Sequence, residues 1–159
     1  MNQAPVEIVI PREKAVFWLD RNGRWRNDAG LFRNSRIIEH FHSAIRRDAG
    51  GYYLSQEREG ISEKVYFPYE DTALFVVDVK TGDPAELILN TRRRLPLDPA
   101  GLLVENDALY TVAGDERIRF TDRALLKMAD LLEFEEEGYF IRLGKGRLRI
   151  REKSDSGLK

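Results

Sequence analysis

The longest apolar run of the chain lies within residues 65–79, whose sequence is VYFPYEDTALFVVDV. Residues 74–77 are apolar at both odd and even positions, which is typical of a strand covered on both faces in the middle of a sheet. A turn at 81–84, TGDP, and a further stretch at 86–91 predict an antiparallel return. We therefore expect a central strand at 72–80, entered through the acidic pair Glu70 and Asp71.

The residues before this run predict a strand and a hairpin. Apolar residues alternate over 6–10 and stop at a proline, which indicates an edge strand. Asn22-Gly23 separates two β-forming stretches and favours a tight hairpin turn. The hairpin would carry Trp18 and Trp25.

A helix and two strands follow. Ser35 is a good N-cap, and apolar residues then recur at helical spacing, which predicts a helix over 36–47 with Arg46 and Arg47 in its last turn. The apolar positions are Ile37, Ile38, Phe41, Ala44 and Ile45. Strands at 52–56 and 61–67 should pair antiparallel around Gly60.

The second half begins after an arginine- and proline-rich segment. Residues 92–94, followed by Pro96 and Pro99, predict a crossing segment rather than a central strand. Strands at 102–105, 108–113 and 116–121 should precede a helix capped by Asp122 that runs to about residue 134. The acidic end of this helix predicts basic partners in a final hairpin over 139–152, where the arginines are Arg147, Arg149 and Arg151.

The two halves resemble one another at a shift of 87 residues. Ser35 then coincides with Asp122, and GYYL at 51–54 coincides with GYFI at 138–141. A duplication explains this coincidence, but so does the general likeness of any cap, amphipathic helix and glycine exit.

The predicted fold class is α+β, with two small halves that each contain a mainly antiparallel sheet and one amphipathic helix. The first half covers residues 1–95 and the second covers 96–153. Residues 154–159, SDSGLK, should form a disordered tail.

Composition narrows the function classes. Lys and Arg total 26 against 27 for Asp and Glu, a net charge of −1, which argues against binding nucleic acid or membranes through bulk charge. The chain has no cysteine, so disulfides and thiolate metal sites are excluded. It shows no secretory leader and no apolar run long enough to span a bilayer, so we expect a soluble, cytoplasmic protein.

The histidines and the acidic pair are the first candidates for chemistry. His40 and His42 are the two histidines, but residues i and i+2 of a helix point about 200° apart, so they should not share a metal ion. His42 alone could serve as an acid or base. Glu70 or Asp71 could have a shifted pKa beside the buried run; alternatively Asp71 caps a turn and Glu70 pairs with an arginine.

The arginines are the second candidate. The cluster at 92–94 and the arginines at 147, 149 and 151 could bind phosphate or single-stranded nucleic acid, with Trp25 as a stacking ring between Arg24 and Arg26. Alternatively they form solvated faces or protect a strand edge. The chain lacks GxGxxG, GxxxxGK[ST], GxSxG and HExxH, so nucleotide-binding, serine-hydrolase and zinc-protease functions lose their usual support.

Several motifs together resemble an uncharacterised bacterial family, domain of unknown function 1285. They are RNGRW, the helix ending in RRD, the GGYYL exit and YEDTALFVVDV, and the order of these elements supports the match over about residues 21–152. Glu70 and Asp71 match the family's acidic EDAPF-type pair and Phe75 its aromatic residue, whereas Leu74 stands where the family tends to have proline. The resemblance implies a bacterial, cytoplasmic α+β protein of two related halves and implies no reaction.

We therefore expect a non-enzymatic ligand-binding or regulatory module, with a cleft between the halves and no metal or cofactor. The predicted site residues are Tyr66, Tyr69, Glu70, Asp71 and Arg92. An enzyme that uses Glu70 or Asp71 with His42 or an arginine is one alternative, and a weak single-strand nucleic-acid binder is another. Sheet-edge pairing would make a homodimer.

Overall fold

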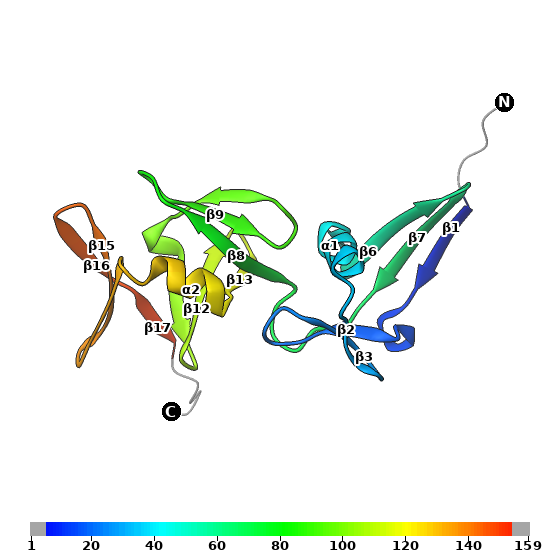
Figure 1. Cartoon of the computed structure of the whole chain (residues 1–159), viewed down its shortest axis with the longest axis horizontal. Coiled ribbons are helices and arrows are strands. Elements are labelled where there is room, and N and C mark those ends of the chain that lie inside the picture. Colours follow the sequence, from blue (N-terminus) through cyan, green and yellow to red (C-terminus); the bar gives the residue numbers. More distant parts are fainter. Residues whose placement is uncertain (1–5, 154–159) are drawn as a thin grey trace. The chain divides into compact units, whose positions relative to one another are not determined.

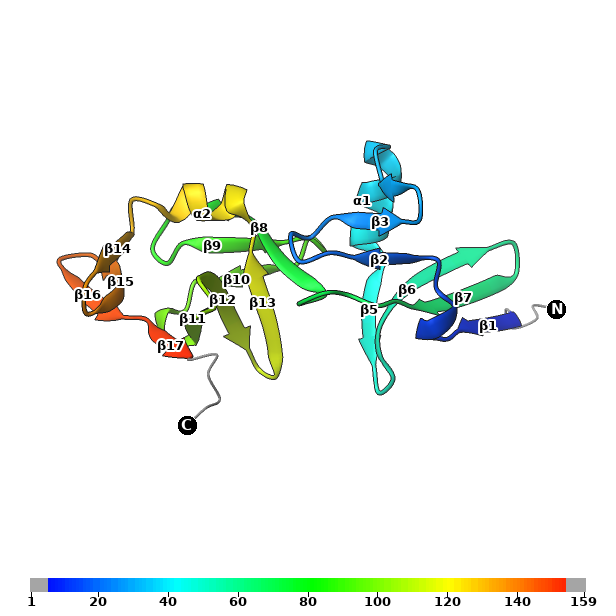
Figure 2. The ribbon, with the colours of Figure 1, turned by 90° about the horizontal axis from the view of Figure 1, so that it is seen from below.

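The computed structural model describes residues 6–153 and shows an α+β fold with many short strands and two α-helices (Figures 1 and 2). The chain divides into two compact units, Met1–Ala73 and Leu74–Lys159. The predicted central strand, β8 (Leu74–Lys80), lies in the second unit and not in the first half, where the sequence analysis placed it. The reason is that β8 pairs in parallel with β13 (Glu116–Phe120). The predicted tail at 154–159 lies outside the described residues.

The first unit is built on a four-stranded sheet of order β1-β7-β6-β5. Its strands are β1 (Val6–Ile10), β5 (Ile45–Asp48), β6 (Gly51–Arg58) and β7 (Ile61–Tyr66). β1 pairs in parallel with β7 at the edge, and the other pairs are antiparallel. The predicted edge strand at 6–10 and the predicted antiparallel hairpin are therefore confirmed.

A small three-stranded sheet completes the first unit. It consists of β2 (Phe17–Leu19), β3 (Trp25–Asn27) and β4 (Gly30–Leu31), after a short 3₁₀ turn at Arg12–Lys14. The predicted turn at Asn22-Gly23 is confirmed. Gly23 has a φ of 80°, a backbone conformation that favours glycine. The buried Asp20 carboxylate accepts hydrogen bonds at 2.9 Å from the N–H groups of Asn22 and Arg24, which fix the turn.

Helix α1 covers Ser35–Ser43 and is shorter than the predicted 36–47. The side chain of Asn34, not Ser35, caps it by accepting from the N–H groups of Arg36 and Ile37. Arg46 and Arg47 lie in strand β5, so their predicted place in the last helical turn is wrong. Ile45 continues the helical spacing in sequence, but it pairs with Leu54 of β6, and this strand pairing ends the helix early.

The core of the first unit is aromatic. The ring of Trp25 contacts those of Phe17, Phe41 and Phe67 at centroid distances of 5.0 to 5.8 Å. Trp25 is only 1% exposed. Perpendicular ring contacts of this kind stabilise a core beyond the area that they bury.

The second unit contains a seven-stranded sheet of order β10-β9-β8-β13-β12-β11-β17. Besides β8 and β13, its strands are β9 (Glu86–Leu89), β10 (Arg94–Pro96), β11 (Leu102–Glu105), β12 (Ala108–Ala113) and β17 (Arg151–Lys153). The predicted hairpin of β8 and β9 and the three predicted strands β11, β12 and β13 are confirmed. The predicted crossing segment at 92–94 instead leads into β10, where Pro96 is tolerated because the strand is at the sheet edge.

Helix α2 covers Asp122–Met128 and packs on β8 and β13 (Figure 1). Its cap is the side chain of Thr121, and it ends before the predicted residue 134 because 132–135 pair with the following strand. A three-stranded sheet follows, made of β14 (Leu132–Glu135), β15 (Gly138–Leu143) and β16 (Gly146–Arg149). The predicted return strand at 147–152 is split, since the buried Ile150 separates β16 from β17, which joins the larger sheet beside β11.

Candidate functional site

Four of the five predicted site residues lie in the first unit, and Arg92 lies in the second. Residues 68–70 run alongside β2. The N–H of Leu19 donates to the Pro68 carbonyl at 3.1 Å, and the N–H of Glu70 donates to the Leu19 carbonyl at 2.9 Å. This pairing fixes the backbone that carries Tyr69 and Glu70.

Glu70 and Tyr69 have structural partners within the unit. One Glu70 carboxylate oxygen accepts from the N–H of Arg21 at 3.1 Å and lies 3.7 Å from its guanidinium, which confirms the interpretation that Glu70 pairs with an arginine. The side chains of Arg21 and Glu70 are both exposed to solvent, so their ion pair contributes little to stability. The Tyr69 ring packs perpendicular to Tyr52 and Phe67.

Tyr66 belongs to a hydrogen-bonded network on the sheet. Its hydroxyl donates to the Asp48 carboxylate at 2.8 Å, and the Lys64 ammonium donates to the same carboxylate at 3.0 Å. Lys64 lowers the pKa of Asp48, with Tyr66 adding to the effect, while the bonds to Asp48 raise the pKa values of Lys64 and Tyr66. A general base or acid works best with a pKa near the working pH, so these shifts favour a structural role.

His42 faces the aromatic core rather than an acidic partner. The indole N–H of Trp25 donates to Nδ1 of His42 at 3.1 Å. Burial lowers the pKa of His42, and Glu39 opposes this shift, so the imidazole is neutral with its proton on Nε2. Within residues 6–153, no hydrogen bond joins His42 to Glu70, and no group of three or more histidine and acidic side chains is placed to hold a metal ion.

Trp25 is not available as the stacking ring that the nucleic-acid hypothesis requires. Because Trp25 is buried in the core, its face cannot receive a base, so that part of the hypothesis is wrong. Arg147 pairs with Glu133 at 3.1 Å and also with Glu135, which confirms the predicted basic partners of this acidic segment. Arg92 has a φ of 73° in the turn after β9, where its N–H donates to the Leu89 carbonyl.

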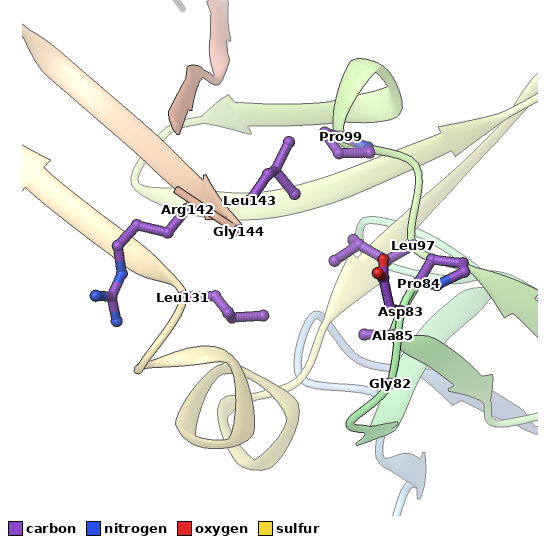
Figure 3. Close-up of a pocket in the computed structure, with 10 residues that line it drawn as sticks. All are labelled: Gly82, Asp83, Pro84, Ala85, Leu97, Pro99, Leu131, Arg142, Leu143 and Gly144. Atoms are coloured by element: carbon purple, nitrogen blue, oxygen red, sulfur yellow. The ribbon is translucent and has the colours of Figure 1, made fainter. Parts of the chain in front are cut away.

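The second unit contains a pocket of about 680 Å³ that the sequence analysis did not predict (Figure 3). Four stretches of chain form it: the turn between β8 and β9, the segment after β10, the loop after α2, and the end of β15 with the turn that follows it. Its lining residues are Gly82, Asp83, Pro84, Ala85, Leu97, Pro99, Leu131, Arg142, Leu143 and Gly144.

The pocket is mostly apolar, with one carboxylate at its wall. Leu131 and Leu143 lie on one side, and Asp83 and Pro84 lie on the other (Figure 3). The guanidinium of Arg142 is directed away from the space and bonds to the Asp130 carbonyl, and it lies 3.6 Å from the Glu133 carboxylate. Among the described residues, the Asp83 carboxylate takes part in no hydrogen bond or ion pair. A ligand would therefore meet apolar walls and a single negative charge.

Sequence reasoning missed this pocket because its walls come from distant stretches with no shared motif. The one local signal was Asp83, a carboxylate beside a proline in the turn that follows the buried run. A smaller hollow of about 230 Å³ lies between α2 and the strands around β14, and it is lined mainly by apolar side chains such as Leu109, Leu125 and Ile150.

Comparison with known proteins gives one informative likeness. No protein-family model and no curated protein matches the sequence. In the described part of the chain, neither helix has the length and apolar character needed to cross a membrane. Two solved structures resemble the chain. A DUF1285 family protein from Silicibacter pomeroyi DSS-3 is 14% identical over 95% of this chain and 90% of its own, with a TM-score of 0.59. One from Shewanella baltica OS155 is 15% identical over 74% of this chain and 93% of its own, with a TM-score of 0.49. The resemblance to domain of unknown function 1285 is thus confirmed at the level of the fold, which the chain shares with the Silicibacter pomeroyi protein over nearly its whole length.

Proposed function

We propose that this protein is a non-enzymatic binding module whose ligand occupies the pocket of the second unit. The observation that carries the proposal is the pocket itself: about 680 Å³, apolar walls, and one carboxylate without a protein partner among the described residues. Small-molecule sites typically enclose about 300–1,000 Å³ and combine apolar walls with a few polar groups that orient the ligand.

The chemistry of the walls favours a small apolar molecule that carries a positive charge. Leu97, Leu131 and Leu143 supply apolar surface to an alkyl or aryl group. Asp83 can then accept charge-assisted hydrogen bonds from an ammonium or guanidinium group of the ligand. Arg142 does not compete for Asp83, because its guanidinium is held by Asp130 and Glu133.

A binding screen tests this proposal. Alkyl- and arylammonium compounds are compared with carboxylates of the same carbon skeleton, by thermal shift and then by calorimetry. We expect the ammonium compounds to bind and Asp83→Asn to weaken them about tenfold or more, since a charge-assisted hydrogen bond contributes about 1.5–3 kcal/mol. Asp28→Asn makes the same chemical change at an exposed carboxylate of the first unit and should leave the affinity unchanged.

Two outcomes would count against the proposal. One is the absence of binding by any ammonium compound at millimolar concentration. The other is equal loss of affinity in Asp83→Asn and Asp28→Asn. The site predicted from the sequence, at Tyr66, Tyr69, Glu70, Asp71 and Arg92, stays a prediction, and a Glu70→Gln variant in the same screen tests it.

A further inference from the structure

The outer edge of strand β1 is open and apolar. Among residues 6–153, only β7 pairs with β1, so the opposite edge of β1 has no strand beside it (Figure 2). Val6, Ile8 and Val9 are 65, 39 and 51% exposed. Val6 and Ile8 lie on one face of the sheet and Val9 lies on the other, because side chains alternate along a strand. A strand with exposed apolar side chains and an unpaired edge is a site for strand addition.

The hydrogen-bonding pattern of β1 defines which groups face that edge. The N–H of Val6 donates to the Gly60 carbonyl at 2.8 Å, so the backbone groups of Val6, Ile8 and Ile10 point toward β7. The backbone groups of Glu7 and Val9 therefore point outward. They present two N–H donors and two carbonyl acceptors to an incoming strand.

We propose that this edge binds a second copy of the chain, with two β1 strands paired antiparallel about a two-fold axis at Ile8. In this register Glu7 of each copy lies opposite Val9 of the other, and these are the residues whose backbone groups are free to form the hydrogen-bonded pairs. Ile8 lies opposite its own counterpart as a non-hydrogen-bonded pair. The residues that must form hydrogen-bonded pairs in this antiparallel register are therefore the same residues whose backbone groups point outward from β1.

The side chains of β1 are self-complementary in the same register. On the face that carries Val65, the row across both sheets reads Val65, Ile10, then Val6 and Ile61 of the second copy, which is apolar throughout. On the other face Glu7 meets Val9, so no two like charges face one another directly. Pairing would join two four-stranded sheets into one and cover the exposed valines. This inference is independent of the pocket in the second unit.

Cysteine scanning tests the register, because the chain contains no cysteine of its own. In Ile8→Cys the two thiols would lie in a non-hydrogen-bonded pair about 4.5 Å apart at Cα, which is within reach of a disulfide. We expect mild oxidation to convert most of this variant to a covalent dimer. Val6→Cys places the two thiols about four residues apart along the strands, and Val16→Cys lies outside β1, so neither should cross-link efficiently. Equal cross-linking of all three variants would overturn the proposal.

A charge pair tests the same register without oxidation. The two-fold axis creates two equivalent pairs of Glu7 and residue 9. Val9→Glu places a carboxylate opposite Glu7 in each pair, whereas Val9→Lys places an ammonium group there. Sedimentation equilibrium from about 1 to 200 μM should show a dimer for the wild type, a dimer for Val9→Lys, and at least tenfold weaker association for Val9→Glu. Circular dichroism checks that both variants fold. A wild type that stays monomeric throughout, or a dimer that both substitutions affect equally, would show that β1 is not the interface.

Discussion

The segments α1–β5–β6 of the first unit and α2–β14–β15 of the second follow one plan. α1 begins at Ser35 and α2 at Asp122, 87 residues later, and the two following strands keep the same offset. The register also agrees, since Ile45 pairs with Leu54 as Leu132 pairs with Ile141. This is the shift at which the sequence resembles itself. A common origin of the two segments stays a prediction.

The likeness extends to a ladder of side chains across three strands. In the first unit Lys64 of β7 lies 5.0 Å from the ring of Tyr53 and bonds to Asp48 of β5. In the second, Arg147 of β16 lies 4.0 Å from the ring of Phe140 and bonds to Glu135 of β14. In both units, a basic side chain of the third strand lies over an aromatic ring of the middle strand and bonds to an acidic side chain of the first strand. The arrangement tolerates a change of all three residues because it depends on charge and ring position.

The segments differ at the hairpin, and the pocket lies where they differ. β6 has eight residues and β15 has six. At the same offset, Gln56 and Glu57 within β6 correspond to Leu143 and Gly144, where β15 ends. The shorter hairpin places an apolar side chain and a turn at the pocket wall. The candidate site therefore arises from the departure from the common plan and not from the plan itself.

Substitution of the matched core residues should have the largest effect. Leu54→Ala and Ile141→Ala each remove a fully buried side chain, and each should lower the free energy of unfolding by about 2–5 kcal/mol. Both tryptophans lie in the first unit, so urea unfolding followed by fluorescence reports on Leu54→Ala, and circular dichroism reports on both variants. Leu126→Ala, at an exposed position, is the control. A cost below about 1 kcal/mol at one site alone would break the equivalence of the two segments.

The turn between β5 and β6 should show the next effect. A Cβ at Gly50 would lie 2.9 Å from the Tyr66 hydroxyl, so Gly50→Ala must displace the Tyr66 ring and weaken its bond to Asp48. We expect a loss of about 1 kcal/mol. The corresponding residue of the second unit is Glu137, and Glu137→Ala should be close to neutral. Equal effects of the two substitutions in urea titrations would contradict this difference.

Exchange of the corresponding hairpin residues, Gln56 and Leu143, should change ligand binding more than stability. Leu143→Gln gives the second hairpin the residue that the first has at Gln56, and it removes part of one apolar wall of the pocket. Because Leu143 is already 38% exposed, we expect a stability change within about 0.5 kcal/mol and a several-fold loss of affinity for the ammonium compounds. Calorimetry on this variant and on Gln56→Leu separates the two hairpins. An unchanged affinity would place the ligand elsewhere.

Local sequence signals predicted most of the strands but not the lengths of the helices. The turns at Asn22-Gly23 and 81–84 and the two-sided apolar run at 74–77 act within a few residues, so their patterns suffice. Ile45 and Leu132 fit both a helical face and a strand, and pairing with Leu54 and Ile141 decides between them. No local pattern contains that information, because the partners are supplied by tertiary structure.

The candidate site depended even more on tertiary structure. Trp25 between two arginines has the sequence of an exposed stacking ring, yet its burial is decided by Phe17, Phe41 and Phe67 from other elements. The pocket needs Asp83 and Leu143 to meet across some 60 residues of sequence. Such convergence follows from the pairing order of strands, which composition and periodicity do not determine.

Substitution of the acidic residues in the two ladders, Asp48 and Glu135, should have the smallest effect on stability, visible only as a change in its pH dependence. Lys64 and then Tyr66 lower the pKa of Asp48, and Arg147 lowers that of Glu135. A folded-state pKa below the unfolded value means that the stabilisation is complete above roughly pH 4–5 and is lost as the pH falls through the folded-state pKa. Asp48→Asn and Glu135→Gln should each lower the stability of their own unit slightly at pH 7, and this difference from wild type should shrink as the pH falls toward 2.

Urea unfolding at pH 7, 4 and 2 measures this convergence for each variant against the wild type. Asp28→Asn is the control, because it makes the same chemical change at an exposed carboxylate outside both ladders and should give the same difference from wild type at every pH. A constant offset for Asp48→Asn as well would mean that the ladder acts through packing rather than charge. If the offset converged for Asp48→Asn but not for Glu135→Gln, the first ladder alone would depend on its ion pair, and Arg147 would act mainly through its contact with the Phe140 ring.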